Sequence, residues 1–197
     1  MAAPSRRERS KAQNRETILA AAARVFAEMG FARATVRDVI RATPLASGTF
    51  YNYFKSKEEV YQALRDDVAL AVRPSLREAR QSADTAQDFL FHGFRAFFVF
   101  IAARRPETPT ADVSRFRMDS PEVLAGFAEL RQDLDAAIAS GLLPTVNADF
   151  LTAALTGLAF ELGDRVKQGA DVDAAARFAT QLVLGGLGAV MPYDAVP

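Results

Sequence analysis

The sequence predicts an all-α fold of about nine helices, divided into a small N-terminal domain and a larger C-terminal domain. Half of the 197 residues are hydrophobic, and the helix-favouring residues Ala and Leu are abundant. Apolar side chains recur three and four residues apart along most of the chain, which is the spacing of one face of a helix. Proline and glycine residues separate these stretches, and each such break is expected to end a helix.

Three short helices are predicted in the first 56 residues. The first ends at Gly30, because glycine readily adopts the positive φ of a helix C-terminal cap. Thr35 is the expected N-cap of the second, with Asp38 in the capping-box position. Pro44 breaks that helix, and the third spans residues 47–54. Two helices joined by a tight break are typical of a helix-turn-helix, whose second helix enters the major groove of DNA.

Charge is unevenly divided along the chain, although the total is zero. Residues 1–57 hold 11 Lys or Arg and four Asp or Glu, a net charge of +7, which leaves −7 on the remainder. A basic segment that also has the helix-turn-helix pattern indicates double-stranded DNA as partner. Two interpretations of its first residues remain open, a basic disordered tail or an N-terminal arm of the DNA-binding domain. The basic residues concerned are Arg6, Arg7, Arg9 and Lys11.

A stretch of about fifty residues, Arg15–Leu64, resembles the tetracycline-repressor (TetR/AcrR) family. The motifs that carry the resemblance are Thr17–Ala22, Phe26, Gly30–Phe31, Thr35–Val39, Gly48–Phe54 and Lys57–Glu58. The resemblance implies a dimeric transcription factor, most often a repressor, with a helical domain that binds small molecules. Residues 1–56 would then be the arm and helix-turn-helix, and 57–197 the effector-binding and dimerisation domain. Pro44 stands where such sequences usually carry glycine, so this turn should avoid the left-handed conformation.

Nine residues are predicted to contact DNA: Thr35, Arg37, Ser47, Gly48, Thr49, Tyr51, Asn52, Tyr53 and Lys57. Asn52 and Ser47 are the best candidates for reading bases, since an Asn amide pairs bidentately with adenine. The tyrosine hydroxyls and that of Thr49 suit phosphate oxygens, as the resemblance also implies. Arg37 would reach a base or a phosphate, and Gly48 allows close backbone approach. Lys57 resembles the family's phosphate-contacting lysine.

The last two predicted helices, 147–167 and 171–191, have apolar faces that indicate a dimer interface. A leucine stripe lies on the first and a small-and-apolar face on the second: Leu151, Leu155, Leu158 and Leu162, then Phe178, Leu182 and Gly185. Glycine inside a helix costs about 0.5–1 kcal/mol relative to alanine, and close helix approach would explain its presence. Intramolecular core is the alternative. The resemblance implies that these helices form a four-helix bundle across a two-fold axis, and hence a homodimer.

A phenylalanine-rich helix over 84–105 predicts an effector pocket. The candidate pocket residues are Phe89, His92, Phe94, Phe97, Phe116 and Phe127. A solid core is the alternative interpretation. The pocket would suit an apolar or aromatic molecule, with or without an anionic head.

The sequence argues against several other classes of protein. It has no cysteine, a single histidine and no HExxH or GxSxG motif, so neither an enzyme nor a metal site is expected, and no cofactor is predicted. The basic start lacks the apolar run of a secretory signal, and Leu182–Met191 is too short to span a bilayer. A cytoplasmic, ligand-responsive repressor without membrane association is therefore predicted. The alternative is a helical carrier or sensor of apolar molecules that does not bind an operator.

Overall fold

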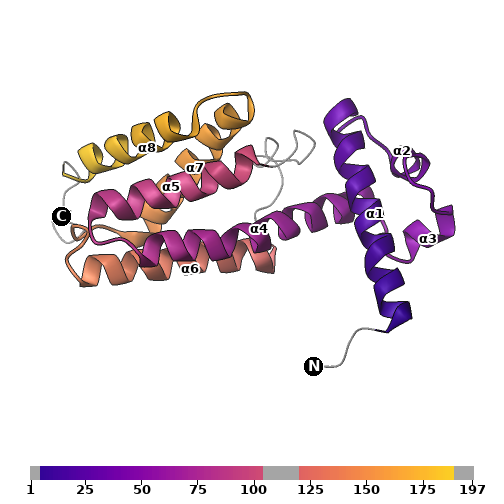
Figure 1. Cartoon of the computed structure of the whole chain (residues 1–197), viewed down its shortest axis with the longest axis horizontal. Helices are drawn as coiled ribbons and strands as arrows, with labels where there is room; N and C mark the ends of the chain where they lie inside the picture. The colour runs from indigo at the N-terminus through magenta and orange to yellow at the C-terminus, as the bar shows by residue number, and fades with distance from the viewer. Residues whose placement is uncertain (1–4, 104–119, 189–197) are drawn as a thin grey trace, which may run out of the picture. The chain divides into compact units, whose positions relative to one another are not determined.

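The computed structural model describes residues 5–103 and 120–188, and all regular structure in these ranges is helical. The helices are α1 (Arg6–Met29), α2 (Val36–Arg41), α3 (Ser47–Tyr51), α4 (Lys57–Gln81), α5 (Ala86–Ala102), α6 (Pro121–Ala139), α7 (Ala148–Lys167) and α8 (Val172–Leu187) (Figure 1). The all-α prediction is confirmed. A further short helix predicted around Pro106–Met118 lies outside the described residues.

The chain divides into two compact units, and the division falls inside α4. The described residues of the first unit are 5–67, and those of the second are 68–103 and 120–188. The sequence placed the domain boundary at the start of α4 instead. The first turns of α4 stay with the first unit because Tyr61 is buried there, with its ring 4.7 Å from that of Phe31 and 5.9 Å from that of Phe26.

The N-termini of α1 and α2 are each fixed by a capping box. The Thr35 hydroxyl donates to an Asp38 carboxylate oxygen at 2.6 Å and accepts from the Asp38 N–H at 3.3 Å. The hydrogen bonds from Thr35 hold the pKa of Asp38 below its usual value. Ser5 and Glu8 form the same box at the start of α1. The basic residues that follow Ser5 are therefore helical, and the disordered-tail interpretation is wrong for residues 6–17.

Glycine and proline act as the sequence predicts at two positions but not at a third. Gly30 ends α1 with φ of 76°. None of the described non-glycine residues has positive φ, so the turn at Pro44 avoids the left-handed conformation as expected. At Pro74 the sequence predicts a kink or a break; the helix is not broken there, and α4 continues to Gln81.

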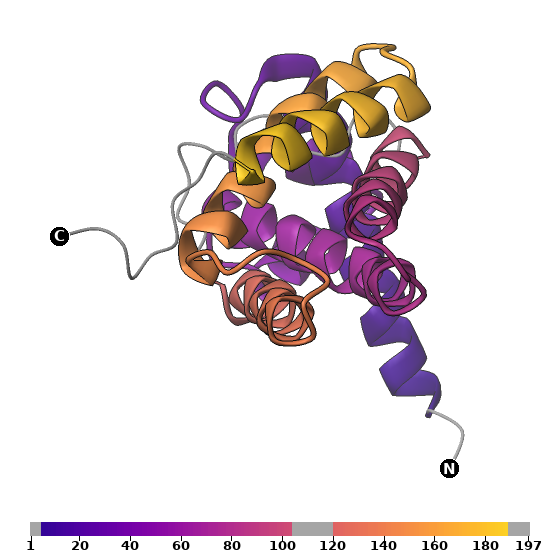
Figure 2. The same ribbon diagram turned by 90° about the vertical axis from the view of Figure 1, so that its left-hand side faces the viewer.

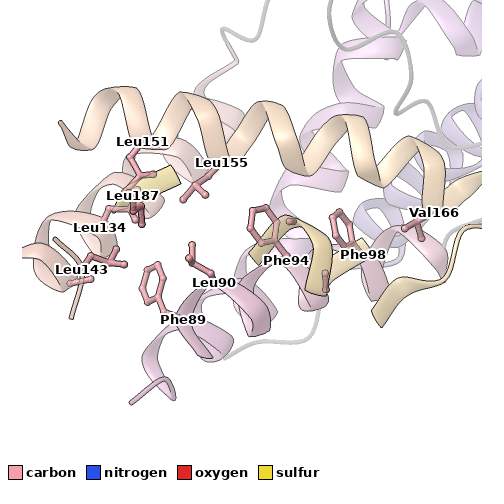
Figure 3. Packing of buried hydrophobic residues seen from close by; sticks show 13 residues of the cluster. Phe89, Leu90, Phe94, Phe98, Leu134, Leu143, Leu151, Leu155, Val166 and Leu187 are labelled. Carbon is pink, nitrogen blue, oxygen red and sulfur yellow. The ribbon is translucent and has the colours of Figure 1, made fainter. Parts of the chain in front are cut away.

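The second unit is a helical bundle around an apolar core. In both views α8 and α6 lie on opposite sides of this unit, with α5 and α7 between them (Figures 1 and 2). Helix α5 packs against both α7 and α8, and α6 packs against α7. Figure 3 shows the labelled core side chains, Phe89, Leu90, Phe94 and Phe98 of α5 with Leu134, Leu143, Leu151, Leu155, Val166 and Leu187.

Charged side chains join the second half of α4 to α6. Glu129 accepts from both Arg73 and Arg77, and Arg80 donates to Asp133 at 2.5 Å. The hydrogen bond from Arg73 lowers the pKa of Glu129. One side of α6 is thus held by α4, while Leu134 points into the core.

Candidate functional site

Helix α3 is held in place by two aromatic rings. Phe50 is 1% exposed and Phe54 is also buried, with 6.1 Å between the ring centroids. These rings fix one face of the helix-turn-helix in the core of the first unit. The side chains of Ser47 and Tyr51 on α3 are exposed to solvent on this rigid support.

The structure leaves six of the nine predicted DNA-contact residues exposed: Thr35, Arg37, Ser47, Gly48, Tyr51 and Asn52. Asn52 is the residue that ends α3, and its N–H donates to the Thr49 carbonyl at 3.2 Å, so its side-chain amide stands at the tip of the helix. The ring of Tyr51 meets that of Phe50 edge-on. Three predicted residues, Thr49, Tyr53 and Lys57, are partly buried.

The side chain of Thr35 caps α2. Its hydroxyl proton goes to Asp38, and the hydroxyl oxygen accepts the Asp38 N–H. The predicted contact of this hydroxyl with DNA would compete with the cap.

Lys57 has a structural role that the sequence analysis missed. Its ammonium donates to the carbonyls of Phe31 at 2.8 Å, Ala34 at 2.9 Å and Ala32 at 3.3 Å. It also lies 4.5 Å from the centroid of the Phe31 ring. Because an ammonium has three N–H groups, these carbonyls satisfy all of them. Lys57 therefore links α4 to the α1–α2 connection, and its phosphate contact stays a prediction.

Four other arginines of the first unit are exposed. Arg24 donates to the Ala42 carbonyl at 3.3 Å and Arg33 to the Met29 carbonyl at 2.8 Å, so both satisfy helix C-termini. Arg37 and Arg41 lie on α2. Arg41 is an additional candidate for DNA contact that the sequence analysis did not select, although its place in the +7 segment was a usable signal.

The leucine stripe of α7 does not form an outer face. Leu151 and Leu155 are buried in the core of their own chain, and Leu158 and Leu162 pack against that core. For Leu151 and Leu155 the assignment to a dimer interface is therefore corrected to intramolecular packing; for the partly buried Leu158 and Leu162 it stays a prediction. The stripe has the right helical spacing, but its neighbour is α5 of the same chain.

A different apolar surface is exposed on α7 and α8. On α7, Phe150 is 72% exposed and Ala154 is exposed beside it. On α8, Phe178 and Leu182 are 56% and 54% exposed. Gly185 lies on the same face, with nothing within 4 Å of the position a Cβ would take. We call these five residues the α7–α8 surface.

The structure places the predicted pocket residues in different surroundings. Phe89 and Phe94 belong to the buried cluster, and His92 is exposed because it lies on the opposite side of α5. Phe97 is partly buried and packs edge-on against Phe160, with the ring centroids 5.7 Å apart. Phe116 lies outside the described residues.

A groove of about 540 Å³ lies instead between α6 and α7. Of the predicted pocket residues, Phe127 lines it. Its full lining is Phe127, Ala128 and Arg131 from α6, with Asp149, Thr152, Ala153, Thr156, Gly157 and Phe160 from α7. Aromatic and small apolar side chains make up most of these walls, so the groove fits an apolar molecule.

None of the helices in the described ranges combines enough length with enough apolar character to cross a bilayer.

Known proteins resemble this chain at two levels. Residues 18–64 match the family described as "Bacterial regulatory proteins, tetR family". Over 56 residues, 28% of this chain, the sequence is 43% identical to the HTH-type transcriptional repressor KstR2 of Mycolicibacterium smegmatis. That match covers 27% of the relative's length, so the chain matches only about a quarter of this curated protein.

Solved structures resemble nearly the whole chain. The fatty acid degradation regulator FadR from Bacillus halodurans is 24% identical, with a TM-score of 0.75 over 88% of this chain and 95% of that one. The transcriptional regulator FadR from Bacillus subtilis, solved with stearoyl-CoA, is 22% identical, with a TM-score of 0.71 over 87% and 98%. At these identities the likeness shows a shared fold. The likeness to the tetR family of bacterial regulatory proteins lies in residues 18–64.

Proposed function

We propose that this protein is a sequence-specific, dimeric DNA-binding transcriptional regulator, a repressor that a small apolar effector releases from its operator. The observation that carries the proposal is the geometry of α3 in a segment of net charge +7. Buried Phe50 and Phe54 fix this helix, while Ser47, Tyr51 and Asn52 are exposed on it. A rigid, polar helix on a basic surface is suited to the major groove.

The roles of the exposed residues follow from their chemistry. The Asn52 amide can both donate to and accept from one adenine, and the Ser47 hydroxyl can contact the neighbouring base. The Tyr51 hydroxyl and the Arg37 and Arg41 guanidinium groups are suited to phosphates, which position the protein without reading sequence. The surrounding positive charge supplies the salt-dependent part of the affinity.

Dimerisation is proposed to occur through the α7–α8 surface. Phe150, Phe178 and Leu182 are exposed on these two helices, and Gly185 of α8 leaves room for close approach. A two-fold dimer presents two α3 helices to two related half-sites, and this doubles the contacted DNA.

The α6–α7 groove is the proposed effector site. Release of DNA requires that the ligand favour an arrangement that binds the operator poorly, and couplings of this kind are typically about 1–3 kcal/mol. The relative from Bacillus subtilis was solved with stearoyl-CoA, whose acyl chain is one example of an apolar ligand. The groove alone would also suit an apolar carrier, but a carrier function leaves the +7 helix-turn-helix without a role.

Replacing Asn52 by alanine tests the reading role of α3. We expect the variant to lose roughly 1–3 kcal/mol of binding free energy on the operator and to relax preference at one position per half-site. Gln132→Ala, an exposed amide on α6, is the matched control and should bind as the wild type does. Fluorescence anisotropy with the operator and with single-base variants of it measures both effects. Full sequence preference in Asn52→Ala would remove this residue from the reading set.

A further inference from the structure

We propose that the α6–α7 groove selects apolar ligands with a neutral or cationic head and discriminates against anionic ones. The inference rests on the proposed function, since it takes this groove as the effector site. The inference concerns the part of the groove that Arg131 and Asp149 line. It narrows the charge of the effector's head group, which the sequence left open.

The walls of the groove offer few hydrogen-bond donors. Phe127 and Phe160 contribute rings, and Gly157 leaves open space where a side chain would stand. The two threonine hydroxyls donate to their own helix, Thr152 to the Ala148 carbonyl and Thr156 to the Thr152 carbonyl, each at 2.7 Å. Each hydroxyl has thereby used its single proton. Only its acceptor capacity remains for a ligand.

The charged residues of the groove are already combined with one another. Arg131 and Asp149 are the charged side chains of the lining, and the Arg131 Nη1 donates to the Asp149 Oδ1. The Arg131 Nε also donates to the Asp135 carboxylate at 3.0 Å. These three groups together carry a net charge of −1. The cation that would attract an anionic head is therefore surrounded by two carboxylates.

The consequences differ for the three kinds of head group. A carboxylate or phosphate placed beside Arg131 would face two like charges, and like-charge juxtaposition disfavours binding. An amine would find carboxylate oxygens and the threonine oxygens as acceptors. A hydroxyl would donate to the same oxygens without adding a charge.

Three probes with the same ring and chain isolate the effect of the head: 4-phenylbutylamine, 4-phenylbutan-1-ol and 4-phenylbutanoate. Calorimetric titration of the full-length protein at pH 7 is expected to show the amine and the alcohol binding at least tenfold more tightly than the carboxylate. Tighter or equal binding of the carboxylate overturns the proposal, as does failure of all three probes to bind.

Three substitutions test whether the probes bind in this groove and whether its charges set the head-group preference. Ala153→Trp fills the groove from an exposed position and should weaken the amine and the alcohol at least tenfold; Gly157→Leu is a second variant with the same expectation. Asp149→Asn removes one carboxylate from Arg131 and should strengthen carboxylate binding at least threefold. The matched control is Asp173→Asn, which breaks the exposed Arg95–Asp173 pair and should leave the preference unchanged.

Each outcome bears on the proposal separately from the proposed function. If neither Ala153→Trp nor Gly157→Leu weakens probe binding, the probes bind elsewhere and the proposal is overturned. An unchanged preference in Asp149→Asn overturns the electrostatic explanation. Operator binding, measured on the same protein without any probe, tests the proposed regulator independently.

Discussion

Replacing Lys57 by methionine is expected to lower the free energy of unfolding of the first unit by about 2–4 kcal/mol. Methionine keeps the apolar stem over Phe31 but removes the ammonium that binds the Phe31, Ala32 and Ala34 carbonyls. Phe31 and Ala34 are themselves buried, so their carbonyls would lose a charged partner in a poorly hydrated place. Urea unfolding followed by near-ultraviolet circular dichroism measures the effect, because the chain has no tryptophan and three of its four tyrosines precede residue 62.

A nearby lysine separates this structural effect from the loss of one charge. Lys55→Met removes the same charge from an exposed position and should change stability by less than about 0.5 kcal/mol. Both variants should lose some DNA affinity through the lower net charge. If Lys57→Met is as stable as Lys55→Met but binds operator much more weakly, Lys57 is a phosphate contact and its carbonyl contacts are dispensable.

Replacing Leu182 by glutamate is expected to dissociate the dimer. The change places an unpaired carboxylate at the centre of the α7–α8 surface, where dimerisation would have to bury it at a cost of several kcal/mol. We expect the dimer dissociation constant to rise at least 100-fold, equivalent to about 2.7 kcal/mol. Sedimentation at micromolar concentration should change from twice the 21.4 kDa chain mass to once. Operator affinity should fall with it, because a monomer reads one half-site.

Two variants act as controls for this surface. Leu124→Glu introduces the same charge at a leucine that is 49% exposed on α6, and it should remain dimeric. Leu155→Ala removes a buried core side chain and should cost about 2–5 kcal/mol of stability without a specific effect on dimerisation. A Leu182→Glu variant that sediments as the wild type does would remove α8 from the interface.

Local signals in the sequence were sufficient for the helix-turn-helix. Thr35 and Asp38 form the predicted capping box, and Gly30 takes the positive φ expected of it. Such features depend on residues within one helical turn, which a sequence displays directly. Pro74 is the exception: a proline disfavours a helix interior, yet α4 continues through it with its first turns packed in the first unit and its later ones paired with α6.

Whether an apolar helix face packs in the core or against a second copy could not be predicted from local sequence signals. Helix α7 has the buried leucine stripe on one side and exposed Phe150 and Ala154 on another. Periodicity identifies both sides as apolar but does not say whether the neighbour is α5 or a second copy. The phenylalanines of α5 present the same ambiguity: the structure buries Phe89, Phe94 and Phe98 in the core and leaves Phe97 only partly buried.

Contacts between distant residues were also beyond the sequence patterns. Lys57 meets the Phe31 carbonyl across 26 residues, and Arg131 meets Asp149 across 18. No local sequence motif predicts either of these contacts. Arg131 and Asp149 both line the groove, so its location between α6 and α7 could be found only from the packed structure.

The most direct test of the central claim is selection of bound sequences from random double-stranded DNA by the wild-type protein. The proposed regulator predicts enrichment of an inverted repeat whose half-sites lie about one helical turn, roughly 10 base pairs, apart or a multiple of it. Affinity for the selected DNA should exceed that for scrambled DNA by at least about 10³-fold and should fall steeply with salt. Recovery of random sequences, with no inverted repeat enriched, would contradict the assignment of α3 as a sequence-reading helix.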